Sequence, residues 1–344
     1  MKTMSKTSLY IVACLCALSS LAAQRQGFTY DRLLERHDKD RDGIVTKEEF
    51  SGNQPLFAHM DHDKDGRINR DEFDNAMKVR NTRKQPENTT VQRDLEYAVE
   101  DGESLRLDLY LPENAKTAPA LVVWIHGGGW KNGDKANVNP AILRLVGDGY
   151  SVASINYRLK DLSIHPKNIH DCKGAVRWLR SKAETYGYDP SRIAVGGGSA
   201  GGHLALLLGM SFGNTEMEGT VGGNTNQSTA VKAIIDLYGP SELTVMLEKN
   251  ERLARSHGFI MEQLASASPL TYLSPNDPPV LILHGDRDKT VPVEQSQLLH
   301  ERYQKAGLES ELHIIEGAGH GGMVFSDEER YRLIKAFLDR HLAE

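Results

Sequence analysis

One stretch of this chain constrains its fold more than any other. Residues 193–208 read IAVGGGSAGGHLALLL, so five glycines surround Ser199 and an apolar run lies on each side. Glycine weakens both helices and strands, and this many glycines indicate a backbone path along which Cβ atoms would collide. Residues 197–201 match G-x-S-x-G, which is typical of a nucleophile elbow, a strained strand-to-helix turn that exposes its serine. In such a turn the residues two before and two after the serine, here Gly197 and Gly201, come so close together that Cβ atoms on them would collide.

Strand patterns alternate with helix patterns on both sides of this turn. Residues 120–125, ALVVWI, form a continuous apolar run, which indicates a strand buried on both faces of a sheet. The sequence predicts strands over 105–110, 120–125, 150–155, 193–195, 233–237, 279–283 and 311–315, and helices over 140–145, 168–186, 203–210, 293–306 and 327–342. This alternation predicts the α/β class, with a doubly wound, mostly parallel sheet whose chemistry lies at the carboxyl ends of the strands.

Glycine-rich turns between a strand and a helix also bind phosphates, and this is the main alternative for the turn. The sequence lacks the Lys-Ser/Thr ending of a nucleotide loop, and it has no G-x-G-x-x-G followed by a suitably placed acid. The formal net charge of −6 is mild and argues against a nucleic-acid partner.

Three further loops follow expected strands and carry residues that acyl transfer needs. HGGGW, directly after ALVVWI, would offer backbone N–H groups to a developing oxyanion. HGDRD, after PVLIL, places Asp286 and Asp288 just past a strand, so both are candidates for an acid that orients a histidine, and Asp236 is a weaker third candidate. GAGHG places His320 where a general base would stand.

The order serine, acid, histidine along the chain is that of the α/β-hydrolases. Over residues 91–344 the chain resembles this superfamily in the motifs HGGGW, NYR, DPSRI, GGSAGG, HGDRDKTVP and GAGHG. It is similar to the esterase/lipase branch with an HGGG oxyanion loop, and especially to bacterial carbohydrate esterases of the acetyl-xylan and feruloyl type. The resemblance implies a serine esterase without a catalytic cofactor. The implied site comprises the triad Ser199, Asp288 and His320 and the oxyanion donors Gly128, Gly129 and Ala200.

Other residues near these motifs receive structural interpretations. We expect His126 to hold its own loop by hydrogen bonding, His203 to pack within its helix and His284 to support the acid loop. Cys172 falls on a helical pattern and is interpreted as a small buried hydrophobe. Residues 241–272 have a helical pattern that either covers the site and sets specificity or belongs to ordinary core packing.

The region before residue 80 carries two acidic loops of a different kind. Residues 38–49, DKDRDGIVTKEE, and residues 61–72, DHDKDGRINRDE, both fit D-x-D-x-D-G-x5-E, the twelve-residue EF-hand loop. Oxygen ligands in this pattern suit Ca²⁺. The predicted ligands are Asp38, Asp40, Asp42, the Ile44 carbonyl and Glu49 in the first loop, and Asp61, Asp63, Asp65, the Arg67 carbonyl and Glu72 in the second.

The flanks of these loops resemble the EF-hand family over roughly residues 28–80. Tyr30 and Leu33 suit an entering helix, Phe50 and Phe73 suit core anchors, and the apolar residues at loop position 8 should pair in a short two-stranded contact. We expect two calcium sites in a structural role, in a small all-α EF-hand pair. A solvated acidic turn and a dockerin module are the alternatives.

The first 23 residues have a basic start, an apolar run over 9–21 and two closing alanines, which predicts a cleaved secretory signal peptide. An anchoring helix and a lipoprotein processing box ending at Cys14 are the alternatives. Cleavage would remove Cys14 and Cys16. The predicted organisation is therefore a signal peptide over 1–23, an EF-hand pair over 24–80, a polar linker over 81–90 and a catalytic domain over 91–344.

The sequence thus predicts a secreted or periplasmic serine ester hydrolase that removes acetyl or feruloyl groups from polysaccharides. Its expected partner is an esterified polysaccharide or a small ester, with no nucleic acid and no membrane span. A peptidase or amidase, a lipid esterase and a calcium-dependent anchoring protein with a secondary hydrolase domain remain open.

Overall fold

The computed structural model of this chain describes residues 30–50, 57, 60, 61, 63, 65–73, 87–113, 115–159, 165–247 and 250–343. The chain divides into two compact units, Met1–Gln85 and Pro86–Glu344. The predicted signal segment over 1–23 lies outside the described residues. Among the helices that are described, none is both long enough and apolar enough to cross a membrane.

The smaller unit contains α2 (Tyr30–His37) and two short strands, β1 (Val45–Thr46) and β2 (Arg67–Ile68). The strands pair antiparallel with Val45 opposite Ile68, which confirms the predicted contact between position 8 of each loop. The buried residues that surround this contact form one small core, namely Tyr30, Leu33, Val45, Phe50, Phe57, Met60, Ile68 and Phe73. The expected entering helix and both phenylalanine anchors are therefore present.

The larger unit is built on one eight-stranded sheet in the order β10-β9-β8-β7-β5-β6-β4-β3. Its strands are β3 (Thr89–Glu100), β4 (Glu103–Pro112), β5 (Leu121–Ile125), β6 (Ser151–Ile155), β7 (Ile193–Gly198), β8 (Ala233–Leu237), β9 (Val280–Gly285) and β10 (Ser310–Ile315). Six neighbouring strands run parallel, namely β10, β9, β8, β7, β5 and β6. Strands β4 and β3 add an antiparallel edge. This is the doubly wound, mostly parallel sheet that the alternation predicts.

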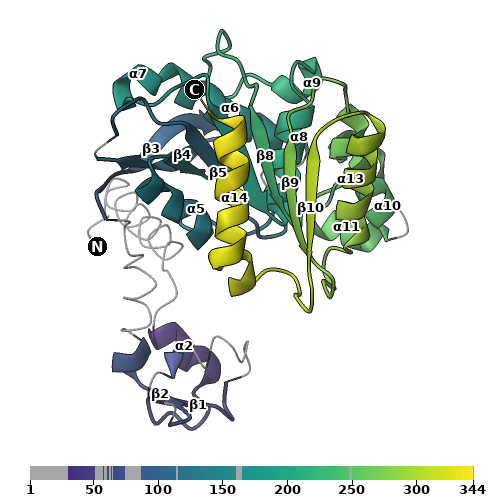
Figure 1. The fold of residues 1–344 in the computed structure, drawn as a ribbon. Helices are drawn as coiled ribbons and strands as arrows, with labels where there is room; N and C mark the ends of the chain where they lie inside the picture. Colours follow the sequence, from purple (N-terminus) through teal and green to yellow (C-terminus); the bar gives the residue numbers. More distant parts are fainter. Residues whose placement is uncertain are drawn as a thin grey trace, which may run out of the picture. The chain divides into compact units, whose positions relative to one another are not determined.

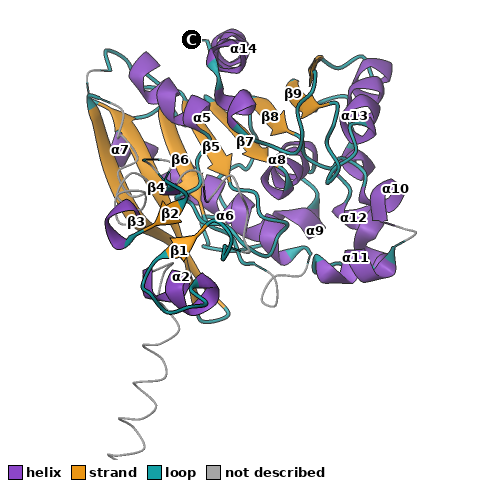
Figure 2. Ribbon diagram, turned by 90° about the horizontal axis from the view of Figure 1, so that it is seen from below, coloured by secondary structure: helices purple, strands orange, loops and turns teal. Residues whose placement is uncertain are grey.

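Helices cover both faces of the sheet, as Figures 1 and 2 show. They are α5 (Pro140–Arg144), η2 (Leu145–Asp148), α6 (Lys167–Ser181), α7 (Ala183–Tyr186), α8 (Ala200–Met210), α9 (Thr215–Glu218), α10 (Leu243–Leu247), α11 (Glu251–Ser256), η3 (Met261–Gln263), α12 (Leu264–Ala267), η4 (Pro269–Tyr272), α13 (Glu294–Lys305), η5 (Met323–Ser326) and α14 (Glu328–His341). Alternate side chains of each central strand enter two separate cores: α6, α8 and α13 complete one core, and α5 and α14 complete the other.

Besides shifts of a few residues at the ends of other elements, two boundaries differ from the sequence-based expectation. Strand β3 begins at Thr89, so the last two positions of the predicted linker over 81–90 belong to the sheet. The single helix expected over 168–186 is two helices, α6 and α7, which meet at Lys182; Gly187 closes α7 in the left-handed conformation at φ 78°. Both differences lie away from the carboxyl ends of β5, β7, β9 and β10, where the candidate site is built.

Candidate active site

Ser199 lies at the tight turn between β7 and α8. Its φ of 56° and ψ of −123° place a non-glycine residue in a strained backbone conformation. A Cβ on Gly197 would lie 2.3 Å from the backbone of Gly201, and a Cβ on Gly201 would lie 2.1 Å from the carbonyl oxygen of Ile125. The glycines that flank the serine are therefore required by close backbone approach, as the sequence pattern predicts.

The structure brings Ser199, His320 and Asp288 together from three different strand ends. His320 Nε2 lies 2.8 Å from Ser199 Oγ, and His320 Nδ1 lies 2.6 Å from Asp288 Oδ2. A carboxylate can only accept a hydrogen bond, so Nδ1 carries the imidazole proton and Nε2 presents its lone pair to the serine hydroxyl. This arrangement can remove the proton of Ser199 and make its oxygen a nucleophile.

The geometry distinguishes between the three acids. Asp288 has a fully buried side chain, and its Oδ1 accepts hydrogen bonds from the N–H groups of Thr290 and Val291. Asp286 instead accepts from the N–H of Gly317, at 2.7 Å, and so joins the loop after β9 to the loop after β10. Asp288 alone among the three contacts the imidazole of His320.

Asp236, the third acid, lies beneath the elbow. Its Oδ1 accepts from the N–H of Gly239, and its Oδ2 has no hydrogen-bond partner among the described residues. Burial raises the pKa of Asp236 to about 8, so the side chain is a neutral carboxylic acid at neutral pH. Added Cβ atoms at Gly202 and Gly239 would each lie 2.4 Å from Oδ1, so this acid fills the space between the start of α8 and the end of β8.

The HGGGW loop lies beside the elbow. A Cβ on Gly127 would lie 2.6 Å from the carbonyl oxygen of Gly198 and 3.4 Å from the Cβ of Ser199. No described residue accepts a hydrogen bond from the N–H of Gly128, Gly129 or Ala200. These three amides are the predicted oxyanion donors, and this geometry leaves them available to a substrate.

The remaining histidines behave as structural elements. Buried His126 stacks on Tyr157 at 4.5 Å, and its Nδ1 donates to the carbonyl of Gly127 at 2.8 Å. His284 bonds Ser296 Oγ at 2.6 Å and the Val291 carbonyl at 2.9 Å, and burial lowers its pKa. His284 therefore braces the acid loop, and Cys172 is buried as expected.

Tyr238 is a site residue that sequence reasoning missed. Its ring contacts the His320 ring edge-to-face at 4.9 Å, and its own φ of 45° is unusual for a tyrosine. Burial raises the pKa of Tyr238 to about 12, so the phenol stays neutral. An aromatic residue directly after β8, followed by Gly239-Pro240, could have been found by inspecting the carboxyl end of every strand.

The two acidic loops of the smaller unit each gather three carboxylates. In the first loop the ligand atoms of Asp38, Asp40 and Glu49 lie within 4.8 Å of one another, and in the second those of Asp61, Asp63 and Glu72 do so. Asp42 and Asp65 lie outside these groups of three and accept from the backbone N–H groups of Ile44 and Arg67. The Oδ1 of Asp61 is buried and has no hydrogen-bond partner in the described part of the chain.

With this geometry established, comparison with known proteins identifies the family. The BD-FAE family model matches residues 107–303, a range that contains HGGGW, the elbow and the acid loop. The chain belongs to the BD-FAE family. An EF-hand model matches residues 54–78, which contain the second acidic loop.

Solved structures with the same α/β-hydrolase fold resemble this BD-FAE protein. A truncated form of a carbohydrate esterase from gut microbiota superposes with a TM-score of 0.70 at 29% identity, covering 76% of this chain and 100% of that chain. Butyrate-bound esterase Est2 of Thermogutta terrifontis gives a TM-score of 0.64 at 29% identity, covering 75% of this chain and 96% of that chain.

Curated relatives of this BD-FAE protein carry esterase names. Esterase LipC of Mycobacterium tuberculosis is 33% identical over 229 residues, which are 62% of this chain and 56% of LipC. An isoprenylcysteine alpha-carbonyl methylesterase of Arabidopsis thaliana is 24% identical over 240 residues, 65% of this chain and 56% of that protein. The chain thus spans about half the length of the curated relatives it matches.

Proposed function

We propose that this protein is a serine carboxylic-ester hydrolase that removes acetyl or feruloyl groups from polysaccharides. The observation that carries the proposal is the continuous hydrogen-bond chain from Asp288 through His320 to Ser199. It ends at a strained serine that stands beside a glycine-rich loop with available N–H groups.

The first half of the reaction forms an acyl-enzyme. His320 Nε2 takes the hydroxyl proton as Ser199 Oγ attacks the ester carbonyl carbon, and Asp288 stabilises the resulting imidazolium. The N–H groups of Gly128, Gly129 and Ala200 would stabilise the oxyanion of the tetrahedral intermediate. His320 then returns the proton to the leaving alcohol. In the second half His320 activates water, which releases the acid and restores Ser199.

A carbohydrate ester is the substrate class that the neighbours favour. Similar solved structures include a carbohydrate esterase, and an acetyl ester-xyloside bifunctional hydrolase of Caldicellulosiruptor lactoaceticus, which gives a TM-score of 0.61 at 26% identity, covering 70% of this chain and 89% of that chain. The predicted signal peptide, if cleaved, would deliver the enzyme to a secreted or periplasmic location where such polymers are met.

The test is a panel of acetylated xylan, feruloylated arabinoxylan, a long-chain lipid ester and a peptide anilide. We expect turnover of the carbohydrate esters by the wild type and none by Ser199→Ala. Asp288→Asn should lower kcat by about 10⁴ because His320 loses its correct tautomer. Asp286→Asn is the matched control, since Asp286 contacts a backbone amide and not the imidazole.

Three results would contradict the proposal. Equal activity of Ser199→Ala and the wild type would remove the serine from the mechanism. Preferential cleavage of the anilide would make the protein a peptidase or amidase, and preference for the lipid ester would make it a lipid esterase.

We also propose that both acidic loops bind Ca²⁺. All the gathered donors are oxygens, which is the ligand type that Ca²⁺ prefers. The buried Oδ1 of Asp61, which has no hydrogen-bond partner among the described residues, fits a cation, because a buried carboxylate oxygen without a partner is otherwise costly. Bound Ca²⁺ would hold each loop closed through its position-12 glutamate, Glu49 or Glu72, and would take no part in the ester chemistry.

A further inference from the structure

The HGGGW loop has an unusual run of backbone conformations. Gly128, Gly129 and Trp130 are three consecutive residues with positive φ, at 122°, 61° and 57°. Glycine adopts such angles readily, but tryptophan does not. A strained non-glycine conformation persists only where the surroundings hold it. The side chain of Trp130 must therefore be anchored, and its anchor also fixes the amides that precede it.

Aromatic rings surround the Trp130 indole, which is only 5% exposed. The rings of His203, Phe259 and His257 each contact it edge-on, at centroid distances of 5.1, 5.0 and 5.7 Å. These contacts restrict the indole but do not set its rotation by themselves. The directional contact is a hydrogen bond: Trp130 Nε1–H donates to His203 Nδ1 at 3.2 Å.

Both ring nitrogens of His203 form hydrogen bonds, so the ring that accepts from Trp130 is itself fixed in place. Its Nε2–H donates to the carbonyl oxygen of Ala267, the last residue of α12, at 2.7 Å. Indole N–H can only donate and a carbonyl can only accept, so one neutral tautomer of His203 satisfies both partners. Complete burial lowers the pKa of His203 to about 4, which keeps that neutral form at neutral pH.

His203 also belongs to the first turn of α8, the helix whose first residue is Ala200. One side chain thus joins the helix that carries the Ala200 amide to the loop that carries the Gly128 and Gly129 amides. The junction therefore connects the two elements that carry the three predicted oxyanion donors.

We infer that His203 is a positioning residue of the oxyanion hole, acting through its hydrogen bond to Trp130. The inference rests on the proposed esterase function and deepens it. Under this inference, the hydrogen bond between His203 of GGSAGGH and Trp130 of HGGGW aligns the amides around the developing oxyanion.

Four variants separate this role from simple packing. His203→Phe keeps a ring but removes both hydrogen bonds. His203→Asn offers an amide oxygen near the Nδ1 position and can still accept from Trp130. His203→Gln reaches toward Ala267 but offers no acceptor at the Nδ1 position. Trp130→Phe keeps an aromatic ring and removes the donor.

The readouts are kcat and KM on p-nitrophenyl acetate, with active sites counted by end-point labelling with a fluorophosphonate. We expect kcat to fall about tenfold to a hundredfold in His203→Phe, His203→Gln and Trp130→Phe, with little change in KM, because misplaced donors act on the transition state. His203→Asn should retain most of kcat. The double variant Trp130→Phe/His203→Phe should lose no more than His203→Phe alone, since both single variants remove the same hydrogen bond between Trp130 and His203.

Inhibition by a phenylboronic acid, which mimics the tetrahedral intermediate, should weaken in parallel with kcat. Wild-type kcat in Trp130→Phe, a rise in KM alone, or equal loss in His203→Asn and His203→Phe would overturn the inference. If His203→Phe fails to fold, Trp130→Phe and His203→Asn decide the question. Failure of the proposed function is distinguishable, because it would show as Ser199-independent activity or as no ester hydrolysis by the wild type.

Discussion

At the scale of single residues, two buried aspartates near the nucleophile have different surroundings. Asp288 is fully buried yet surrounded by N–H donors, whereas Asp236 is buried with one oxygen lacking any partner among the described residues. Burial without a described partner for Oδ2 favours the protonated form of Asp236. A neutral aspartic acid therefore lies beneath the elbow at neutral pH.

This difference predicts a pH dependence of stability. Asp236 has a pKa of about 8 in the folded state and about 3.9 when unfolded. The folded state therefore binds the extra proton between pH 4 and pH 8, and its contribution to stability is lost as pH rises through that window. Relative to Asp236→Asn, we expect the wild type to lose up to about 5 kcal/mol of unfolding free energy from pH 4 to pH 8.

Urea unfolding followed by tryptophan fluorescence measures this, since Trp124, Trp130 and Trp178 all lie in the larger unit. Asp148→Asn, at an exposed position, controls for the loss of an aspartate. Parallel pH profiles for the wild type and Asp236→Asn would show that Asp236 is ionised in the folded state.

The sequence could predict the role of a site residue only where a local motif indicates it. Ser199 and His320 follow from their glycine-rich turns. The local pattern alone leaves Asp286 and Asp288 as alternatives; the family resemblance implies Asp288, and Asp288 is the acid that contacts His320. The pairing of Trp130 with His203 joins positions 73 residues apart, so the sequence indicated only that His203 is packed. Long-range hydrogen bonds of this kind depend on the completed fold.

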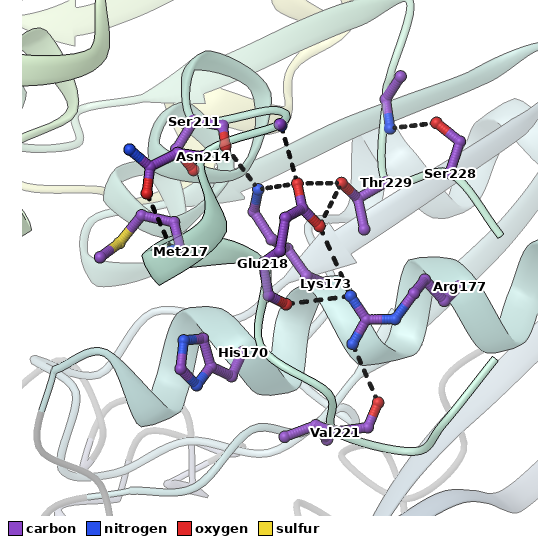
Figure 3. A network of polar contacts seen from close by, with 12 residues as sticks. His170, Lys173, Arg177, Ser211, Asn214, Met217, Glu218, Val221, Ser228 and Thr229 are labelled. Carbon is purple, nitrogen blue, oxygen red and sulfur yellow. Dashed lines mark hydrogen bonds and ion pairs between the residues drawn. The ribbon is translucent and has the colours of Figure 1, made fainter. Parts of the chain in front are cut away.

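At the scale of elements, helix α6 shows how a polar helix face is accommodated in the core. Figure 3 shows Lys173 and Arg177 on this helix meeting Glu218, at the end of α9. Lys173 Nζ donates to Glu218 Oε1 at 2.8 Å and to the carbonyl of Ser211 at 2.9 Å. Arg177 donates to the carbonyls of Glu218 and Val221. The network fastens the segment after α8 onto α6.

Glu218→Gln should destabilise the larger unit by about 3 kcal/mol, because the fully buried ammonium of Lys173 would lose its counter-charge. Adding Lys173→Met should restore part of that loss, since no uncompensated charge then remains. Glu216→Gln, at an exposed position on the same helix, is the control. The eleven residues of α8 separate Ser211 from the elbow by roughly 16 Å, so kcat should not change. Thermal unfolding measures the predicted loss of stability, and p-nitrophenyl acetate turnover measures kcat. A lower kcat in folded Glu218→Gln would contradict the prediction that kcat does not change.

Elements were predictable where their pattern is regular. The buried runs of β5, β7, β8 and β9 have no competing interpretation, and each appears in the sheet. Strand β3 was not anticipated because it is a charged edge strand interrupted by register shifts around Asp94, whose φ is 56°. Such a strand lacks the alternation on which sequence interpretation depends.

At the scale of the whole molecule, the chain joins a unit with a small core to a unit with two extensive cores. A core as small as that of the first unit would be marginal without the Ca²⁺ proposed for its two loops. All the residues proposed for catalysis lie within Pro86–Glu344. The two units should therefore respond differently to removal of Ca²⁺.

In calorimetry of the full chain, EDTA should lower or abolish the melting transition of the smaller unit and leave the main transition and kcat unchanged. Glu49→Gln and Glu72→Gln should weaken Ca²⁺ binding, because the position-12 carboxylate closes each loop. Glu48→Gln, an exposed neighbour, should bind as the wild type does. Loss of esterase turnover in EDTA would instead show that the metal regulates the enzyme.

The sheet order has one consequence for the timing of activity. The nucleophile follows β7, the acid follows β9, and the base follows β10, which comes after the other described strands in the sequence and lies at one edge of the sheet. Because a ribosome releases the chain from its N-terminus at about 5–20 residues per second, a nascent chain exposes Ser199 long before His320 exists. The proposed ester hydrolysis therefore requires that synthesis has passed His320.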